Sequence, residues 1–345
     1  EDKPFFAEVG LYRIPAKHNL DPVLPWKLEV LMEDENSKYN KKFLLDYKLN
    51  KKYIIKPDGL KVLADKDRPI WHAAWENQKI NILLMLLTLL ILTLAIIKME
   101  ILSKFDSRRK FFRYLFLIWI LVWLGWYAGG QITIVSILMW ATAPINHPSW
   151  NVLLSDPLLA ILILYVVISF IFWGRGLFCG WLCPFGSFQE LLAKAAQYMK
   201  IPQIKIPEKI NKRSLNIKYL VLISLILISF YSADFLNVGS EIEPFKTAIS
   251  MKFQREWYFV LYAIILLFTG LFIERFFCRF ICPLGAFMVL GGKLRLGNPL
   301  KRRNECGNPC KLCAKACPID AIDVKGNINM NECFYCLDCQ SLYHD

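Results

Sequence analysis

The stretch Phe178–Phe188, FCGWLCPFGSF, recurs as FCRFICPLGAF over Phe277–Phe287. Six of the eleven aligned positions are identical, including both cysteines, the proline and the glycine. Each copy follows a pair of apolar segments. The repeat therefore predicts two similar halves around a pseudo-symmetry axis, as in membrane proteins that are built from repeats.

Five apolar segments are predicted to cross a membrane as helices. None contains a charged residue, and the whole chain is 55% hydrophobic with a mean hydropathy of +0.35. One such segment can also be a buried helix of a soluble protein, but five in series favour a membrane core. The predicted spans are Ile80–Ile97, Tyr114–Tyr127, Leu158–Trp173, Tyr219–Tyr231 and Trp257–Ile273.

The connecting segments differ in their content of lysine and arginine. Basic residues are frequent between the first and second spans, between the third and fourth, and after the fifth, whereas residues 128–157 contain none. Because basic loops stay in the cytoplasm, we expect these loops and the C-terminal tail there, and the N-terminal residues 1–78 in the periplasm. This bias also explains the net charge of +13, so nucleic-acid binding is not expected.

The chain is predicted to have three parts. Residues 1–78 alternate over Trp26–Met32 and Phe43–Ile55, which indicates a small β-rich segment. Residues 79–290 form the transmembrane helical core, and residues 291–345 form an α+β ferredoxin-type domain. The expected fold class is a mainly α membrane protein with an internal two-fold repeat. The first and last parts are expected to be incomplete, because the chain lacks an initial methionine and its last cysteine group looks unfinished.

Seven cysteines near the C-terminus have the spacing of a dicluster ferredoxin. Cys306-x3-Cys310-x2-Cys313-x3-Cys317-Pro318 is followed by Cys333-x2-Cys336-x2-Cys339. Bacterial ferredoxins use C-x2-C-x2-C-x3-C-P twice, and the cysteine before proline ligates the other cluster. We therefore expect one [4Fe–4S] cluster to be held by Cys333, Cys336, Cys339 and Cys317.

A second [4Fe–4S] cluster is expected to take three ligands from Cys306, Cys310 and Cys313. The first of these spacings is one residue longer than the common pattern, and no fourth cysteine is visible, so the fourth ligand is expected beyond Asp345. Zinc and disulfides are alternative uses of clustered cysteines. Zinc does not explain this order of seven cysteines, and disulfides do not suit a cytoplasmic location.

The repeated motif supplies a further candidate metal site. Cys179 with Cys183, and Cys278 with Cys282, have a spacing that places both thiols of a motif on one face of a helix, at the inner end of a span. The repeat symmetry can bring all four together at the inner membrane edge. Four thiolates suit iron, an iron–sulfur cluster or copper. A redox-active dithiol pair and cysteines that merely pack are the alternatives.

Over about residues 70–345 the chain resembles the NosR/NapH-type polyferredoxins. The resemblance lies in the membrane spans, the paired C-x3-C-P motifs and the terminal dicluster ferredoxin. Several details are similar to NosR-type members, and so is the segment before the first span, which NapH-type members lack. These details are Gly125-Trp126-Tyr127 with Gln131, the stretch Gly180–Gly186, Glu243-Pro244-Phe245-Lys246-Thr247-Ala248 and Cys336-Leu337-Asp338-Cys339-Gln340.

The resemblance implies a role in nitrous oxide respiration, in the bacterial cytoplasmic (inner) membrane. NosR-type proteins support the expression and activity of nitrous oxide reductase. The implied partners are nitrous oxide reductase or its accessory proteins, membrane lipid, and quinol or a cytoplasmic protein as electron donor. Full-length members also carry a periplasmic flavin domain, so FMN is expected only in sequence upstream of this chain.

The expected function is membrane electron transfer rather than stand-alone catalysis, and no catalytic residue is assigned. One alternative is a redox-sensing regulatory protein or a copper-site assembly protein, because soft thiolates also bind Cu(I). Another is a quinol-oxidising subunit of the NapH type, against which the N-terminal segment argues.

Overall fold

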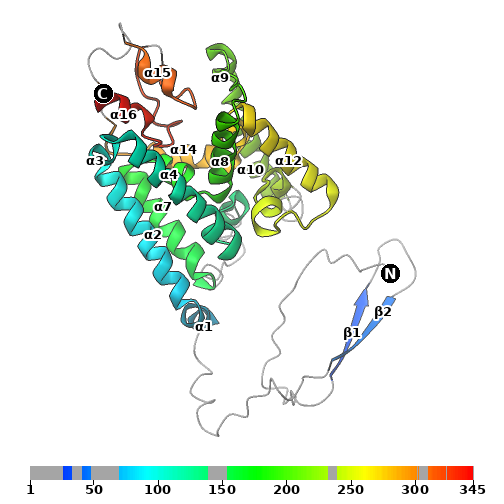
Figure 1. Cartoon of the computed structure of the whole chain (residues 1–345). Coiled ribbons are helices and arrows are strands. Elements are labelled where there is room, and N and C mark those ends of the chain that lie inside the picture. Colours follow the sequence, from blue (N-terminus) through cyan, green and yellow to red (C-terminus); the bar gives the residue numbers. More distant parts are fainter. Residues whose placement is uncertain are drawn as a thin grey trace. The chain divides into compact units, whose positions relative to one another are not determined.

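The computed structural model describes residues 26–32, 41–47, 70–138, 154–231, 239–300, 302, 310–323 and 325–344. The chain divides into two compact units, Glu1–Arg68 and Pro69–Asp345. The second unit contains the helices and the cysteine-rich C-terminal segment (Figure 1). The division into three parts that the sequence predicts stays a prediction.

In the first unit the described residues form a two-stranded antiparallel sheet. Strand β1 covers Trp26–Met32 and strand β2 covers Lys41–Tyr47, and Trp26 pairs with Tyr47. β1 has the bounds expected from the sequence. β2 overlaps the second expected strand, of which residues 48–55 lie outside the described residues. A β-rich domain in this unit stays a prediction.

The second unit is built from apolar helices with clear local start signals. In α7 (Pro157–Phe172), Asp156 is the N-cap and accepts hydrogen bonds from the amides of Leu158 and Leu159, both at 3.2 Å. Pro157 is the first residue of this helix. A backbone N–H at that position has no acceptor within the helix, so proline loses no hydrogen bond there. The other long elements are α1 (Ile70–Asn77), α2 (Lys79–Ile97), α4 (Asp106–Trp119), its π-helical continuation η3 (Ile120–Tyr127), α10 (Ile217–Tyr231) and α12 (Trp257–Phe272).

Each of the five predicted spans coincides with helical structure in α2, α4 with η3, α7, α10 and α12. Three described helical stretches are long and apolar enough to cross a membrane, namely Lys79–Ile97, Asp106–Tyr127 and Glu208–Phe230. Helices α7 and α12 are apolar but have only 16 residues each. The chain is thus a helical membrane protein, and the number of five crossings stays a prediction.

The outward faces of these helices agree with a lipid environment. Large apolar side chains are exposed on α2 (Leu90), α7 (Leu164), α10 (Leu227) and α12 (Phe268). Water disfavours apolar surface on this scale, whereas lipid does not. Side-chain exposure therefore supports the membrane assignment independently of helix length.

Two inner helices follow the two copies of the repeat. Helix α8 (Pro184–Tyr198) packs against α4, η3 and α12, and helix α14 (Pro283–Gly292) packs against α10 and α7. Each inner helix thus contacts the first span of its own half and the last span of the other half. This exchange of neighbours agrees with a two-fold repeat.

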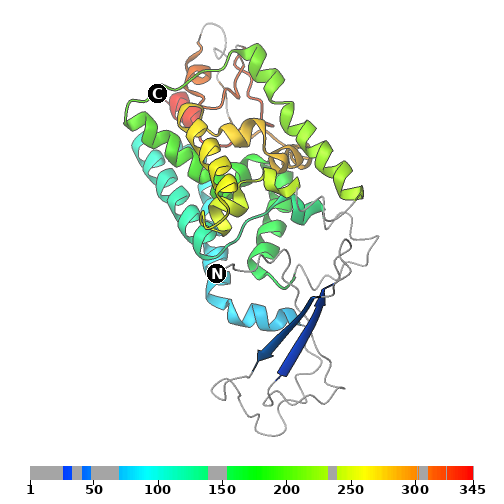
Figure 2. The same ribbon diagram turned by 90° about the vertical axis from the view of Figure 1, so that its right-hand side faces the viewer.

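The C-terminal segment lies at one end of the helical unit, here called the ferredoxin end (Figures 1 and 2). It contains the short helices α15 (Leu312–Ala316) and α16 (Asp338–His344), and an antiparallel bridge between Ile322 and Ile328. Helix α16 packs against α15 and against α3 (Met99–Ser103). The segment is therefore in direct contact with the helical core.

Candidate functional site

The first cysteine of each C-x3-C-P motif lies in a short helix, Cys179 in η4 (Phe178–Leu182) and Cys278 in α13 (Phe276–Phe280). The second cysteine lies beyond that helix. Cys183 has φ −75° and ψ 114°, because a residue before proline avoids the helical conformation. The two cysteines of a motif therefore do not lie within one helix, because each short helix ends before the cysteine that precedes the proline. The shared face of the two thiols stays a prediction.

The second cysteines instead cap the helices that begin at the prolines. The sulfur of Cys183 accepts a hydrogen bond from the amide of Gly186 at 3.4 Å, and that of Cys282 from Gly285 at 3.2 Å. A helix N-terminus carries partial positive charge, which favours a thiolate. Both copies therefore present a sulfur at a helix start, where the helix end reduces the cost of the thiolate that a metal binds.

The motifs lie at the tips of hairpins inside the bundle. Near the far end of η3, a Cβ on Gly125 would lie 2.9 Å from Cβ of Pro184, the first residue of α8. Later in α8, Glu190 forms an ion pair with Arg113 of α4. Helix α8 therefore runs antiparallel to α4 and η3, from the interior toward the ferredoxin end.

The hairpin tips lie some way along the helices from the ferredoxin end, and the expected location of the thiols at the inner membrane edge stays a prediction. Twelve residues separate Arg113 from Gly125, which corresponds to about 18 Å of helix. After α7 the chain turns back into the bundle as far as Pro184, and α8 leads it out again. The second copy forms a matching hairpin, because beyond α14 the amide of Leu296 bonds the carbonyl of Ile171 in α7 at 2.9 Å.

The four motif cysteines are buried and converge inside the bundle. Cys179, Cys183, Cys278 and Cys282 are each at most 8% exposed. Electrostatic coupling links Cys183 and Cys282 to the other two thiols. Over the described residues, no three His, Cys, Asp or Glu side chains are already close enough to hold one ion. The thiols are therefore neighbours in the bundle, although no three of them meet at one point.

Polar side chains complete this site and fit a bound cation. The Gln131 amide nitrogen lies 4.0 Å from the sulfur of Cys183, and its buried carbonyl oxygen has no hydrogen-bond partner within the described part of the chain. The thiol of Cys278 donates to Oε1 of Gln189 at 3.4 Å. The nearby Glu243 is 3% exposed. A buried oxygen without a partner beside a thiol is an available ligand position.

A second set of cysteines, Cys317, Cys333, Cys336 and Cys339, lines one enclosed cavity, together with apolar side chains such as Ile319. These are the four residues that the spacing assigns to the first cluster. Burial raises the pKa of Cys333 to about 11, so a charged thiolate needs compensation here. Iron supplies such compensation, and an apolar cavity with four cysteines is the donor set of a [4Fe–4S] cluster.

The second cluster set is only partly described. Cys310 and Cys313 are half-buried, and the thiol of Cys313 lies 3.7 Å from the carbonyl oxygen of Cys339. Cys306 lies outside the described residues. The two cysteine loops are thus adjacent, and the assignment of the second ligand set, with its fourth ligand beyond Asp345, stays a prediction.

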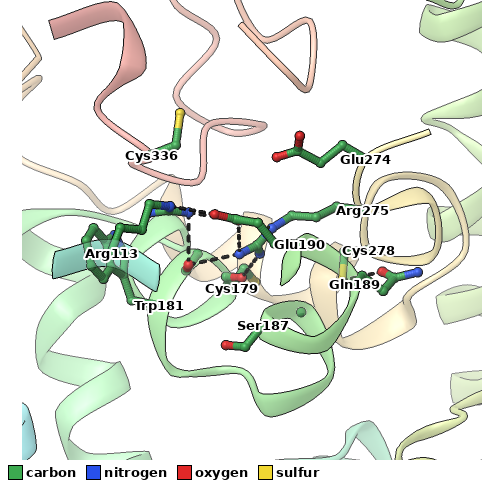
Figure 3. Close-up of polar contacts among 12 residues, drawn as sticks. Arg113, Cys179, Trp181, Ser187, Gln189, Glu190, Glu274, Arg275, Cys278 and Cys336 are labelled. Carbon is green, nitrogen blue, oxygen red and sulfur yellow. Dashed lines mark hydrogen bonds and ion pairs between the residues drawn. The ribbon is translucent and has the colours of Figure 1, made fainter. Parts of the chain in front are cut away.

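A buried charge network that the sequence patterns do not predict connects the ferredoxin-type segment with the core. Figure 3 shows Glu190 between two arginines, with Oε1 2.5 Å from Nε of Arg113 and Oε2 2.8 Å from Nε of Arg275. Burial opposes ionisation of Glu190, but the two guanidinium groups outweigh it and lower the pKa to about 2. Arg113 also reaches the carbonyl of Tyr335 at 3.4 Å, and Arg275 that of Gly180 at 2.9 Å.

A second charge group lies beside the first. Oε1 of Glu332 in the ferredoxin-type segment is 2.6 Å from Nζ of Lys218, and its Oε2 is 2.8 Å from Arg175. The sequence alone predicts only an orienting role for these cations. Their positions at the edges of apolar segments could have indicated buried ion pairs, but their carboxylate partners lie far away in sequence.

The fold and the two cysteine sites define a class of protein, a helical membrane protein with sites for iron–sulfur clusters. Comparison with protein families agrees with this class. A model described as a 4Fe-4S binding domain matches residues 156–207 and 256–302, each of which contains one C-x3-C-P copy. A model described as NosR matches residues 304–345.

Comparison with known proteins then identifies the family. A Regulatory protein NosR from Pseudomonas aeruginosa is 63% identical over 68 residues, which cover 20% of this chain and 68% of that protein. The whole chain is 39% identical to Regulatory protein NosR of Stutzerimonas stutzeri and 37% identical to Protein NirI of Paracoccus denitrificans. The chain belongs to the NosR family, which confirms the resemblance.

The chain spans about half the length of these longer relatives, 49% of the Stutzerimonas protein and 50% of NirI. No solved structure matches the chain.

Proposed function

We propose that this part of a NosR protein carries electrons through the membrane in support of nitrous oxide reductase. The chain acts as an electron-transfer component of a longer protein. Its partners are nitrous oxide reductase or the accessory proteins of that enzyme, and its electron donor is quinol or a cytoplasmic protein. FMN belongs to the upstream part of the full-length protein.

The observation that carries this proposal is the contact between the two cysteine sites. Nη1 of Arg109 donates to the carbonyl oxygen of Cys336 at 2.8 Å, and Nε1 of Trp181 donates to that of Tyr335 at 3.0 Å. Trp181 is itself a residue of the first C-x3-C-P motif. The backbone beside the cavity of the first cluster is therefore hydrogen-bonded directly to the segment that carries the first pair of motif thiols.

The hairpins supply what the spans lack, namely ligands inside the hydrocarbon layer. That layer is about 30 Å thick, too far for one electron step between its faces. The motif thiols lie between the ferredoxin end and the far end of η3, and so divide the distance. We place the ferredoxin end in the cytoplasm and residues 1–78 in the periplasm, because the basic loops lie on the ferredoxin side.

In this proposal the chain holds three centres. When bound, the metal groups supply the one-electron chemistry, and the protein supplies ligands, burial and hydrogen bonds to sulfur. The first [4Fe–4S] cluster uses Cys317, Cys333, Cys336 and Cys339, the second uses Cys306, Cys310, Cys313 and a further ligand, and iron or copper is held by Cys179, Cys183, Cys278 and Cys282.

The test is a metal and EPR analysis of full-length protein purified anaerobically in detergent. We expect about eight irons with matching sulfide for the two clusters, and additional iron or copper for the motif site. EPR spectra of the reduced protein should show two interacting cluster signals. A copper content of one atom per chain, together with slow reduction and reoxidation of the clusters, would favour a copper-assembly function. Zinc, or no metal at all, would contradict electron transfer.

A further inference from the structure

The backbone of the ferredoxin-type segment lies directly against two glycines of the first repeat copy. A Cβ on Gly176 would lie 2.6 Å from the carbonyl oxygen of Cys333, and a Cβ on Gly180 would overlap the carbonyl oxygen of Phe334. At these distances neither position can accommodate a residue with a Cβ atom. The two glycines therefore form a flat surface that fits this backbone.

The second repeat copy has arginines at the aligned positions. Arg275 aligns with Gly176, and Arg279 aligns with Gly180. Arg275 has φ 56°, a left-handed conformation that glycine adopts freely but that costs free energy for arginine. Its side chain crosses to the first copy and donates to the carbonyl oxygens of Cys179 and Gly180. The halves have thus diverged at the positions that face the docked segment.

The side chain of Phe334 is held between two cations. Its ring centroid lies 5.1 Å from Cζ of Arg175 and 4.7 Å from Cζ of Arg275. The ring is 2% exposed, so these cation–π contacts are desolvated, and such contacts are stronger there than at a surface. One arginine comes from each half of the repeat, and both point at the residue that follows Cys333.

We infer that Gly176, Gly180, Arg175 and Arg275 form a seat for Cys333–Tyr335, and that electrons pass between the first cluster and the membrane core at this seat. The inference rests on the proposed function. The seat is a positioning device, because it holds the backbone beside ligand Cys333 against the backbone beside ligand Cys179. With both metal groups bound, one electron would pass from the reduced [4Fe–4S] cluster held by Cys317, Cys333, Cys336 and Cys339 to the oxidised iron or copper held by the motif thiols, with no bond formed or broken.

The other aligned arginine of the second copy, Arg279, contacts the same segment away from Cys333. Arg279 reaches Asp320 at 3.0 Å, and the carboxylate side chain of Asp320 is 31% exposed. This contact is distant in sequence from Cys333, and it involves side chains rather than backbone. The first copy is therefore the route by which the first cluster contacts the core.

The test uses Gly180→Ala in the full-length, cluster-loaded protein, with Gly297→Ala as the matched control. A Cβ at Gly297 would meet no atom within 4 Å. Hydrogen exchange of the amides over residues 329–341 reports docking directly. We expect at least about tenfold faster exchange in Gly180→Ala and no change in Gly297→Ala. In the same samples, electron transfer from the first cluster to the motif centre should slow at least about tenfold, with unchanged iron content.

A second variant distinguishes the loss of docking from a general folding defect. Phe334→Leu removes the ring between the guanidinium groups but keeps an apolar side chain and the backbone contact. It should raise exchange over residues 329–341 and shift the midpoint potential of the first cluster, while other helices keep their protection. Wild-type exchange and wild-type transfer rates in both variants would overturn the seat. A wild-type protein without clusters would instead overturn the proposed function.

Discussion

The first C-x3-C-P copy receives the ferredoxin-type segment on two glycines, whereas the second copy sends arginine side chains toward it. At the hairpin tips the two copies are alike, because Cys183 and Cys282 each cap a helix and accept an amide hydrogen bond. The repeat has therefore kept its symmetry where four thiols converge. It has lost its symmetry where a single asymmetric domain must dock.

The largest expected effect concerns the symmetric part. Cys183→Ser and Cys282→Ser should each abolish the metal centre of the motif site, because both remove one of the four converging thiols. The loss should be equal in the two variants and should leave the eight or so cluster irons in place. Metal analysis of the purified variants measures this. Unequal losses would show that the two copies bind separate metals.

A smaller but still large effect is expected from Glu190→Gln. The first copy provides Glu190 between Arg113 and Arg275, and the aligned residue of the second copy is Val289. Removing this carboxylate leaves two buried guanidinium groups without their partner, which costs about 3–5 kcal/mol. The thermal unfolding midpoint in detergent should fall by about 10 °C.

The matched control for this variant is Glu208→Gln. Glu208 forms an exposed ion pair with Lys212 at 2.7 Å. Its loss should change stability by less than about 0.5 kcal/mol. Equal effects of the two substitutions would contradict a buried network that holds the first copy to the docked segment.

The smallest expected effect concerns the second copy. Asp320→Asn removes the charge that faces Arg279 but keeps a hydrogen-bonding oxygen, and asparagine tolerates the φ of 51° at this position. The cost should be about 1 kcal/mol or less, because Asp320 is partly exposed. Hydrogen exchange over residues 329–341 should stay near wild-type. Much faster exchange in that segment would instead show that the main docking contact lies in the second copy.

Much of the fold could be predicted from local patterns. Apolar runs without charges placed the helices, and cysteine spacing selected the four residues that line the cavity around Cys333. A single helix carrying both cysteines of a motif is not found, because Cys183 precedes a proline and lies beyond the end of the helix. The depth of the hairpins could not be predicted, because it depends on the contact between Gly125 and Pro184, which are distant in sequence.

The charge network was missed for the same reason. Glu190 and Arg275 are 85 residues apart, and single-sequence patterns do not pair such residues. The signal that could have been used is the comparison of the two copies, since Gly176 and Gly180 align with arginines. Two glycines in one copy and two arginines in the other indicate that the same surface meets different neighbours.

Electron transfer across a membrane tests the central claim most directly. Full-length protein would be reconstituted in vesicles with dithionite trapped inside and ferricyanide outside, with valinomycin and potassium to compensate charge. We expect ferricyanide reduction by the wild-type protein and at least about a hundredfold slower reduction by Cys183→Ser, with both clusters retained. Equal rates for wild type and Cys183→Ser would contradict a route through the hairpin thiols.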